Sequence, residues 1–312
     1  MEFLVISTLN GVVYGLLLFM VSAGLTLIFG MMGVLNFAHA SLYMLGAYVG
    51  YTLSATNFWL GLIAAPLLVG TVGVAIERGL LRRVHAFGHG HQLLLTFGLA
   101  FVIEEVIKLF FGNFPVNYSV PPELRFAAFR VFGTDYPFYR VFIGLVAVLM
   151  FASLWLLLIR TRVGLIVRAA ERRPIMAEAL GHNVPLVFTG VFGLGSALAG
   201  LAGAVAGAFY PTSPNMALEL GVVVFVVVVV GGLGSIEGSL LASLLIGLFT
   251  SFAVGLDWSL ASVLDTVGLG EWARGVGGIF TLTVSSLSGA VPFMLMLIVL
   301  LVRPAGLLGE RG

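Results

Sequence analysis

The sequence contains no cysteine and a single lysine in 312 residues. The lack of cysteine excludes disulfide bonds, thiolate chemistry and cysteine metal sites. The single lysine, Lys108, follows a valine and an isoleucine, whereas the phosphate-binding P-loop G-x-x-x-x-G-K-[ST] needs a lysine directly after a glycine. This chain therefore cannot hydrolyse ATP through that motif, and any energy from ATP must come from another protein.

Charged residues are also scarce. They form 9% of the chain, while hydrophobic residues form 60% and the mean hydropathy is +1.13, whereas ordinary globular domains contain about 25% charged residues. A soluble protein of this length would need a far more polar surface. The net charge of +1 and the confinement of arginine to a few segments exclude the basic groove of a nucleic-acid-binding protein. The composition predicts a polytopic membrane protein surrounded by lipid.

Long apolar runs predict the membrane spans, which need about 20 residues each. The runs are too long and too continuous for barrel strands, so we expect helices throughout. The candidate spans are 4–29, 33–53, 58–76, 93–112, 138–159, 185–209, 218–232, 237–256 and 285–302. The sequence GGLGSIEG divides the seventh run from the eighth, so the count is nine, or eight if one piece is re-entrant. We predict an all-α helical membrane bundle, with residues 1–312 forming one transmembrane domain.

The placement of arginine predicts the orientation in the membrane. Ten arginines fall on one side: Arg78, Arg82, Arg83, Arg160, Arg162, Arg168, Arg172, Arg173, Arg303 and Arg311. Four fall on the other side: Arg125, Arg130, Arg140 and Arg274. The side with ten is expected to be cytoplasmic, which places the N-terminus outside and the C-terminus inside. The first run lacks a basic n-region and a cleavage site, so we expect it to be retained as a span.

Small residues recur at four-residue spacing in several runs. The sets are Gly11 and Gly15, Gly46 and Gly50, Gly203 and Gly207, and Ser196, Gly200 and Ala204. This spacing lets helix backbones approach closely in lipid, where apolar burial supplies no driving force between helices. We expect tight helix packing there rather than ligand binding. The tetrapeptides GMMG (30–33) and GGLG (231–234) each precede a long helix, as matching helix breaks of two pseudo-repeats would.

The longest polar stretch, RTRVGLIVRAAERRPIMAEALGHNVP at 160–185, is too charged to span the membrane. Pro174 suits the first turn of a helix and Gly181 suits a helix end, so we predict two short cytoplasmic helices over 163–172 and 174–181. The second would carry a compact apolar face made of Ile175, Met176, Ala177, Ala179, Leu180 and Gly181. The arginines alone would be explained by positive-inside anchoring, but the small apolar face is typical of a helix that docks in a groove of another protein.

This stretch resembles the cytoplasmic coupling segment of ABC importer permeases, in which a short helix with an EAA…G core seats in the ATPase subunit. Glu178, Ala179 and Gly181 match that core in a compressed form. The fuller match is to the branched-chain amino acid permease family, with the pattern G…RA……MA..LG.NV, although His182 replaces a usual aliphatic residue. The resemblance implies an ATPase-coupling segment over 160–184 that includes Gly164, Arg168, Ala169, Ala170, Met176, Ala177, Glu178, Leu180, Gly181, Asn183 and Val184.

Three further stretches resemble the same family in chain order. GLTLIFGMMGVLNFAHASLYMLGAYVGY is similar to its first signature, with Ala40 in place of a frequent glycine. VVGGLGSIEGSLLASLLIGL is similar to its Gly-rich late-span motif, with Glu237 at a frequent proline position. VPFMLMLIVLLVRPAGLLG is similar to its C-terminal signature, and only residues 256–283 fall outside the resemblance.

The resemblance implies a permease subunit of an ABC importer in the prokaryotic inner membrane. Such a subunit works with a second permease, identical or related, with two cytoplasmic ABC ATPase subunits, and with a periplasmic or extracellular solute-binding protein. The solute would be a branched-chain amino acid or a related small solute, which the binding protein commonly selects. No cofactor, metal or catalytic residue is implied, so the chain is not expected to be an enzyme.

Asn36, His39 and Ser41 lie within one otherwise apolar run, where an unsatisfied polar group is costly. Asn36 and His39 are three residues apart on neighbouring positions of one helix face, and Tyr43 lies one turn further. The resemblance implies that this helix lines the translocation path between two permeases, and polar residues inside a membrane usually face such a cavity. Alternatively, Asn36 caps a broken helix and His39 bonds a carbonyl of a neighbouring helix. Both roles are compatible if the helix begins at the edge of the path.

Glu104 and Lys108 are four residues apart, in the favourable order for an ion pair, and Glu105 is adjacent. Either carboxylate, together with His39, could relay protons in a stand-alone secondary transporter, which is the alternative function. A membrane-embedded enzyme would need paired carboxylates, a histidine cluster or a nucleophile dyad within the bundle, and the sequence contains none. The histidines of HAFGHGH (85–91) fall in a predicted cytoplasmic loop, 77–91, where a solvated role is favoured over zinc binding.

Overall fold

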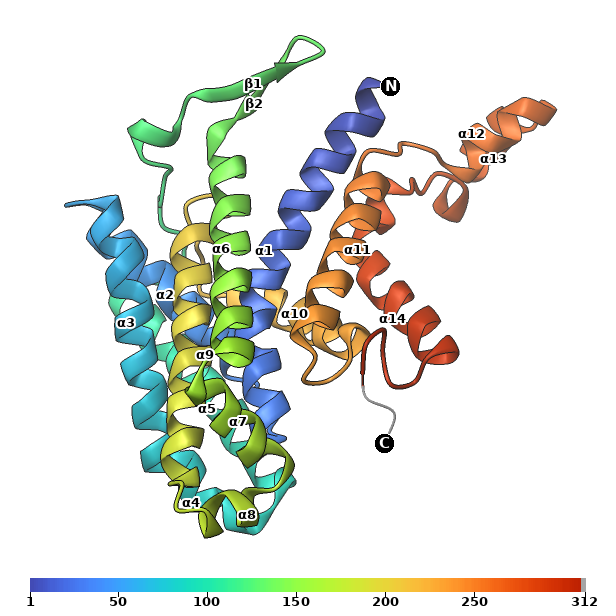
Figure 1. The fold of residues 1–312 in the computed structure, drawn as a ribbon. Coiled ribbons are helices and arrows are strands. Elements are labelled where there is room, and N and C mark those ends of the chain that lie inside the picture. Colours follow the sequence, from blue (N-terminus) through green and yellow to red (C-terminus); the bar gives the residue numbers. More distant parts are fainter. Residues whose placement is uncertain (310–312) are drawn as a thin grey trace.

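A computed structural model describes residues 1–309, except for the side chains of residues 86, 267 and 273. The chain folds as an almost wholly helical bundle (Figure 1). The α-helices are α1 (Glu2–Met32), α2 (His39–Ser54), α3 (Phe58–Ile76), α4 (Arg82–Val84), α5 (His89–Phe111), α6 (Phe138–Arg160), α7 (Arg162–Arg172), α8 (Pro174–Ala179), α9 (Val184–Ala206), α10 (Met216–Gly231), α11 (Ile236–Val254), α12 (Leu260–Leu264), α13 (Gly270–Val276) and α14 (Val291–Val302). The shorter elements are η1 (Glu77–Leu81), which is π-helical, the 3-10 turns η2 (His85–Phe87), η3 (Pro122–Leu124), η4 (Asp265–Val267), η5 (Gly278–Phe280) and η6 (Ser285–Ala290), and the strands β1 (Ala127–Val131) and β2 (Thr134–Pro137).

Helix α1 forms the axis of the bundle. It is 31 residues long, and residues 17–28 are all buried, as expected of a helix surrounded by protein on every side. It packs against α11, α9 and α6, and α9 packs in turn against α2 and α3. The first residues of α1 lie at one end of the bundle with the β1–β2 hairpin and α12–α13, whereas α4, α7 and α8 lie at the other end (Figure 1). Because the arginine-rich segments occupy the second end, we call it the cytoplasmic end and the first the outer end.

The predicted small-residue spacing is used where helices cross. A Cβ atom on Gly46 would collide with the backbone of Gly200, and one on Gly203 would collide with the carbonyl oxygen of Tyr43. Gly15 faces the α11 backbone in the same way. These helices approach until backbone contacts backbone, so the prediction of tight packing is confirmed. Burial of apolar surface does not drive helices together in lipid, so the dispersion attraction at these contacts helps to hold the helices together.

Both predicted helix breaks are present, and they contact each other. Helix α1 ends at Met32 because Gly33 adopts a left-handed φ of 63° and donates its N–H to the Phe29 carbonyl. Between α10 and α11, Gly234 packs against Gly30, whose added Cβ would lie 3.0 Å from the Gly234 Cα. The two glycine tetrapeptides therefore meet where α1, α10 and α11 end or begin.

Two predicted boundaries are wrong. Residues 33–38 are not helical, so the span predicted at 33–53 begins only at His39, because the Gly33 turn redirects the chain. The loop predicted at 77–91 is mostly helical: α3 continues through η1 to Val84, and α5 begins at His89. The arginines of this stretch indicated a loop, but Arg78, Arg82 and Arg83 lie in the helical turns that continue α3.

Within residues 1–309, six stretches are long and apolar enough to cross a membrane: α1, α3 with its extension to Val84, α6, α9, α11 and Ser285–Val302. Helix α10 is apolar but has 16 residues, and α2 also has 16. Helix α5 has 23 residues and carries three charged side chains. These three helices account for the difference from the predicted eight or nine spans. The all-α membrane bundle itself is confirmed.

The outer end carries a β-hairpin that the all-α prediction did not include. Strands β1 and β2 pair antiparallel with Arg130 opposite Asp135, and the Arg130 guanidinium donates to the Asp135 carboxylate. Phe132 and Gly133 in the turn both have positive φ, 50° and 86°, as a type I′ turn requires. The strands are short and mostly exposed, so they show no clear alternation of apolar and polar residues by which to predict them.

Candidate coupling site and translocation path

The predicted coupling segment folds as two short helices at the cytoplasmic end, α7 and α8 (Figure 1). The helices predicted at 163–172 and 174–181 are found at Arg162–Arg172 and Pro174–Ala179. Helix α7 follows α6 directly, and α8 leads into α9, so the segment joins two long helices of the bundle. Helix α8 packs against α7 and α9.

Gly164 sits in the sharp turn between α6 and α7. Thr161 caps α7 by accepting a hydrogen bond from the Gly164 N–H at 3.1 Å. A Cβ on Gly164 would collide with the carbonyl oxygens of Leu157 and Leu158, in the last turns of α6. Glycine is therefore required by the close return of α7 onto α6 rather than by contact with a partner.

The tip of the coupling segment is apolar and uncovered. Ile175, Met176 and Leu180, which we call the coupling tip, are 81%, 59% and 79% exposed. Ala177 on the same helix is buried, which fixes α8 against the bundle. A small apolar projection held on a packed base is suited to insert into a groove of another protein.

The other residues predicted for coupling fall into two groups. Ala170 is a buried residue of α7, and its packing sets the position of that helix. Arg168, Ala169 and Glu178 are exposed on α7 and α8. The exposed group is accessible to a partner and includes a charge of each sign, Arg168 and Glu178, whereas Ala170 belongs to the packed base.

Gly181 and Asn183 end one helix and begin the next. Gly181 adopts a φ of 86°, its N–H donates to the Glu178 carbonyl at 2.9 Å, and the His182 N–H donates to the Ala177 carbonyl at 3.1 Å. This is the Schellman closure of a helix C-terminus. The Asn183 Oδ1 then accepts the N–H of the third residue after it at 3.0 Å, which caps α9. The two residues therefore determine how the tip is presented.

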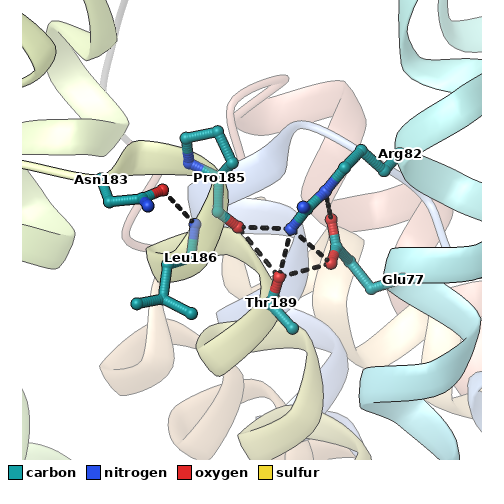
Figure 2. A network of polar contacts seen from close by, with 6 residues as sticks. All are labelled: Glu77, Arg82, Asn183, Pro185, Leu186 and Thr189. Carbon is teal, nitrogen blue, oxygen red and sulfur yellow. Dashed lines mark hydrogen bonds and ion pairs between the residues drawn. The ribbon is translucent and has the colours of Figure 1, made fainter.

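A buried carboxylate joins the end of α3 to the start of α9 (Figure 2). Glu77 is 2% exposed, and its carboxylate accepts hydrogen bonds from Arg82 Nη2 at 3.2 Å and from Thr189 Oγ1 at 2.5 Å. Arg82 Nη2 also donates to the Pro185 carbonyl at 2.9 Å and to Thr189 Oγ1 at 2.6 Å. We call Glu77, Arg82, Pro185 and Thr189 the α3–α9 clamp.

The clamp was not predicted from the sequence because Glu77 and Arg82 are five residues apart, a spacing that puts them on different faces of an α-helix. The π-helical turn η1 lies between them and, with its i to i+5 hydrogen bonds, brings the two side chains together. Single π-turns are frequent at functional sites. The signal available was a carboxylate at the end of an apolar span, where charged residues are rare and usually paired.

The clamp is part of the second of two attachments that hold the coupling segment on the bundle. On one side the segment is joined to α6 through the Gly164 turn. On the other side it runs into the first turn of α9, which the clamp ties to α3. The coupling segment is thereby connected to three helices, α6, α9 and α3.

Asn36, His39 and Ser41 lie together at the start of α2. The Asn36 Oδ1 accepts the N–H two residues ahead at 3.1 Å, and His39 Nε2 lies 2.9 Å from the Val21 carbonyl oxygen of α1. Ser41 Oγ donates to the Ala100 carbonyl of α5 at 3.3 Å. The His39 contact is the predicted bond with a neighbouring helix. The predicted cap is wrong, because Ala38 rather than Asn36 occupies the N-cap position of α2 and no side chain caps this helix.

The same three residues line a cavity of about 170 Å³ between α2, α5 and α10. Within the described part of the chain, Asn36 Nδ2 and His39 Nδ1 are buried without a hydrogen-bond partner. The remaining wall is largely apolar and includes Phe37, Phe97, Phe101, Val222 and Phe225. Tyr43 is buried elsewhere, at the α2–α9 crossing. Asn36, His39, Ser41 and Glu104 therefore contribute a few polar residues to a largely apolar wall, which is the usual character of a small-solute site.

The predicted ion pair on α5 is confirmed. Lys108 Nζ lies 2.6 Å from Glu104 Oε1 and 2.8 Å from Glu105 Oε1. Glu104 also lines the cavity. Because both carboxylates contact Lys108, neither is the lone carboxylate that a proton relay would need.

Comparison with known proteins identifies the family. The family model described as "Branched-chain amino acid transport system / permease component" matches residues 7–300. The high-affinity branched-chain amino acid transport system permease protein LivH of Salmonella typhimurium is 28% identical over 96% of this chain and 94% of its own length. LivH of Escherichia coli is 27% identical and BraD of Pseudomonas aeruginosa 25% identical, over the same shares of the chains. No solved structure matches the chain.

The match extends over nearly the whole chain and includes the coupling segment, the clamp and the cavity. It supports the importer permease over the proton-coupled secondary transporter. The relatives are transport permeases. This chain therefore belongs to the branched-chain amino acid transport system permease family and is a multi-pass permease subunit of an ABC transporter of the inner membrane.

Proposed function

We propose that this permease pairs with a second permease, identical or related, and that two cytoplasmic ATPase subunits seat on the coupling tips of the pair. A periplasmic or extracellular binding protein delivers the solute, which is a branched-chain amino acid or a related small solute. The observation that carries this proposal is the exposed apolar tip, Ile175, Met176 and Leu180, on a packed base. ATP-driven motion of the tip passes through α6, α9 and the clamp, because each state of the ATPases makes different contacts with it.

The proposed path lies at the face formed by α2, α5 and α10. Phe97, Phe101, Leu218 and Val222 line the cavity and are also exposed, so the cavity opens onto an uncovered apolar face. A second permease placed on this face would cover it and complete the cavity from the other side. Apolar walls with a few polar atoms suit a solute that has an aliphatic part and a polar group. The names of the relatives support branched-chain amino acids as this solute.

The test of the assembly is mass spectrometry of the complex purified gently from its native membrane. We expect recovery of a P-loop ATPase and of a second copy or a related permease together with this chain. A known importer purified in parallel shows whether the conditions preserve such complexes. Clean recovery of this chain alone, beside an intact control complex, would contradict the proposed assembly.

The proposed path predicts that Asn36→Leu combined with His39→Leu lowers solute uptake while the complex still assembles. The two lost side-chain hydrogen bonds cost about 1 kcal/mol each, which a large buried bundle tolerates. Uptake falls because two of the polar residues that line the cavity are replaced by apolar ones. Uptake and subunit recovery are measured together, with Ser243→Ala, a buried serine on α11 away from the cavity, as the control. Unchanged uptake with normal assembly would show that these residues serve packing alone.

A further inference from the structure

Residues 256–284, which we call the outer loop, form a closed excursion between two membrane helices. At its base, the Leu256 carbonyl accepts the Ser285 N–H at 3.1 Å, and the Trp258 carbonyl accepts the Val284 N–H at 2.8 Å. Ser259 and Thr283 pair beside these bonds. The two ends of the loop are therefore held together, and everything between them is a separate ordered unit.

The unit is fixed by its own contacts. Ser259 and Ser262 form a reciprocal capping box at the start of α12. Arg274 on α13 binds Asp265 with two hydrogen bonds, at 2.7 and 2.8 Å, and the guanidinium holds the pKa of the Asp265 carboxyl below its usual range. Helices α12 and α13 pack chiefly against each other and against η4 and η5. The outer loop thus has a defined shape without being covered by the bundle.

The surface of this unit is unusually apolar for a loop. Trp258 and Trp272 are 66% and 58% exposed. Seven other large apolar side chains of the loop are also exposed: Leu260, Val263, Leu269, Val276, Ile279, Leu282 and Val284. Loops between helices normally expose polar groups, and contiguous exposed apolar side chains mark contact with a partner or a membrane.

The position of the outer loop determines whether water or lipid contacts this surface. It leaves α11 two residues after Val254 and re-enters at Ser285, and both flanking stretches are long and apolar enough to cross a membrane. Its base is therefore at the membrane surface. Helices α12 and α13 project sideways from the outer end of the bundle rather than along the bundle axis (Figure 1).

We propose that the outer loop is a membrane-interface anchor that rests on the outer leaflet, with Trp258 and Trp272 at the level of the lipid head groups. Tryptophan is enriched at this level because it combines an apolar ring system with an N–H donor. Apolar side chains beside such a ring insert into the boundary between the head groups and the acyl chains. This role is independent of the solute and of the proposed assembly.

The charged residues of the outer loop favour contact with neutral lipid rather than electrostatic binding to anionic lipid. Asp257, Asp265, Glu271 and Arg274 are its charged residues, and two of them neutralise each other. A polybasic segment, which would bind anionic lipid, is absent from the sequence of the loop. Insertion of the apolar side chains therefore carries the contact.

The absence of cysteine from the chain allows a direct test with single spin labels. The labels are placed by Val263→Cys and Ile279→Cys, at side chains that are 56% and 67% exposed and can be replaced without repacking. The matched control is Thr134→Cys, exposed in the turn of the outer β-hairpin. The full complex is reconstituted in phosphatidylcholine vesicles, and collision rates are measured with oxygen, which concentrates in lipid, and with a nickel chelate, which stays in water.

We expect the labels at 263 and 279 to collide more with oxygen than with the nickel chelate, and the label at 134 to show the reverse. If positions 263 and 279 collide with the nickel chelate as readily as position 134, the outer loop stands in water and the proposal is wrong. If both reagents are excluded, a second permease or a binding protein covers the surface, which also overturns the lipid anchor. Transport activity plays no part in the readout.

Discussion

Replacing Met176 and Leu180 together with glutamate is expected to abolish solute uptake while the membrane bundle remains folded. Both side chains are exposed, so the change removes no internal packing. At a protein interface, loss of a central apolar anchor costs about 2 kcal/mol or more, which is roughly a 30-fold weaker complex for each residue. The added carboxylates would also lie unpaired in the ATPase groove, which raises this cost.

The measurement pairs uptake with recovery of the ATPase on the purified permease. Two controls separate docking from nonspecific damage. Met176→Leu with Leu180→Met keeps the tip apolar and should preserve uptake, because volume-conserving swaps cost little. Phe114→Glu places the same charge on an exposed side chain of the outer end and should not release the ATPase. Retention of the ATPase and of uptake by the double glutamate variant would exclude the tip as the docking site.

Arg82→Ala is expected to produce the largest loss of stability among single changes at the cytoplasmic end. It leaves the Glu77 carboxylate buried with only Thr189 to bind it. We expect Arg82→Ala to lower the free energy of unfolding by about 3 kcal/mol, at the lower end of the cost of breaking a buried ion pair. The Arg82 side chain is 43% exposed, so water replaces part of the lost contact. A lower melting temperature of the purified protein is the readout. Arg83→Ala, one residue further and exposed, is the matched control and should change stability little.

A double variant identifies the cause of that loss. Glu77→Gln combined with Arg82→Ala removes the orphaned charge and should melt at a higher temperature than Arg82→Ala alone. Such non-additivity is the signature of a direct charge pair. If the double variant melts at the same or a lower temperature, the cost of Arg82→Ala comes from lost packing of its long side chain, and the clamp is not an ionic contact.

The outer and cytoplasmic ends differ in how well the sequence predicts them. The coupling segment is predicted to within one or two residues, because proline, glycine and the cap-forming asparagine at 174, 181 and 183 act through local backbone geometry. The β-hairpin and the outer loop have no long periodic pattern, and their structure depends on contacts within each unit. Local chemistry therefore sufficed for the coupling segment, but not for 77–91 at the same end, which is mostly helical.

The amino-acid sequence by itself determined the membrane setting, the helical class and the two short helices α7 and α8. These follow from composition and from turn residues that act on their immediate neighbours. The close backbone contacts at Gly46 and Gly203 were also implied, because a four-residue spacing of small side chains has one main use in lipid.

Apart from the ion pair on α5, only the tertiary structure decided which polar groups meet. Glu77 contacts Arg82 because a π-turn changes the facing of residues five apart, and it contacts Thr189 because α3 and α9 pack side by side. Asn36 and Glu104 line one cavity because α2, α5 and α10 converge there. Contacts between distant segments depend on how whole helices pack, and no spacing within a single run encodes that arrangement.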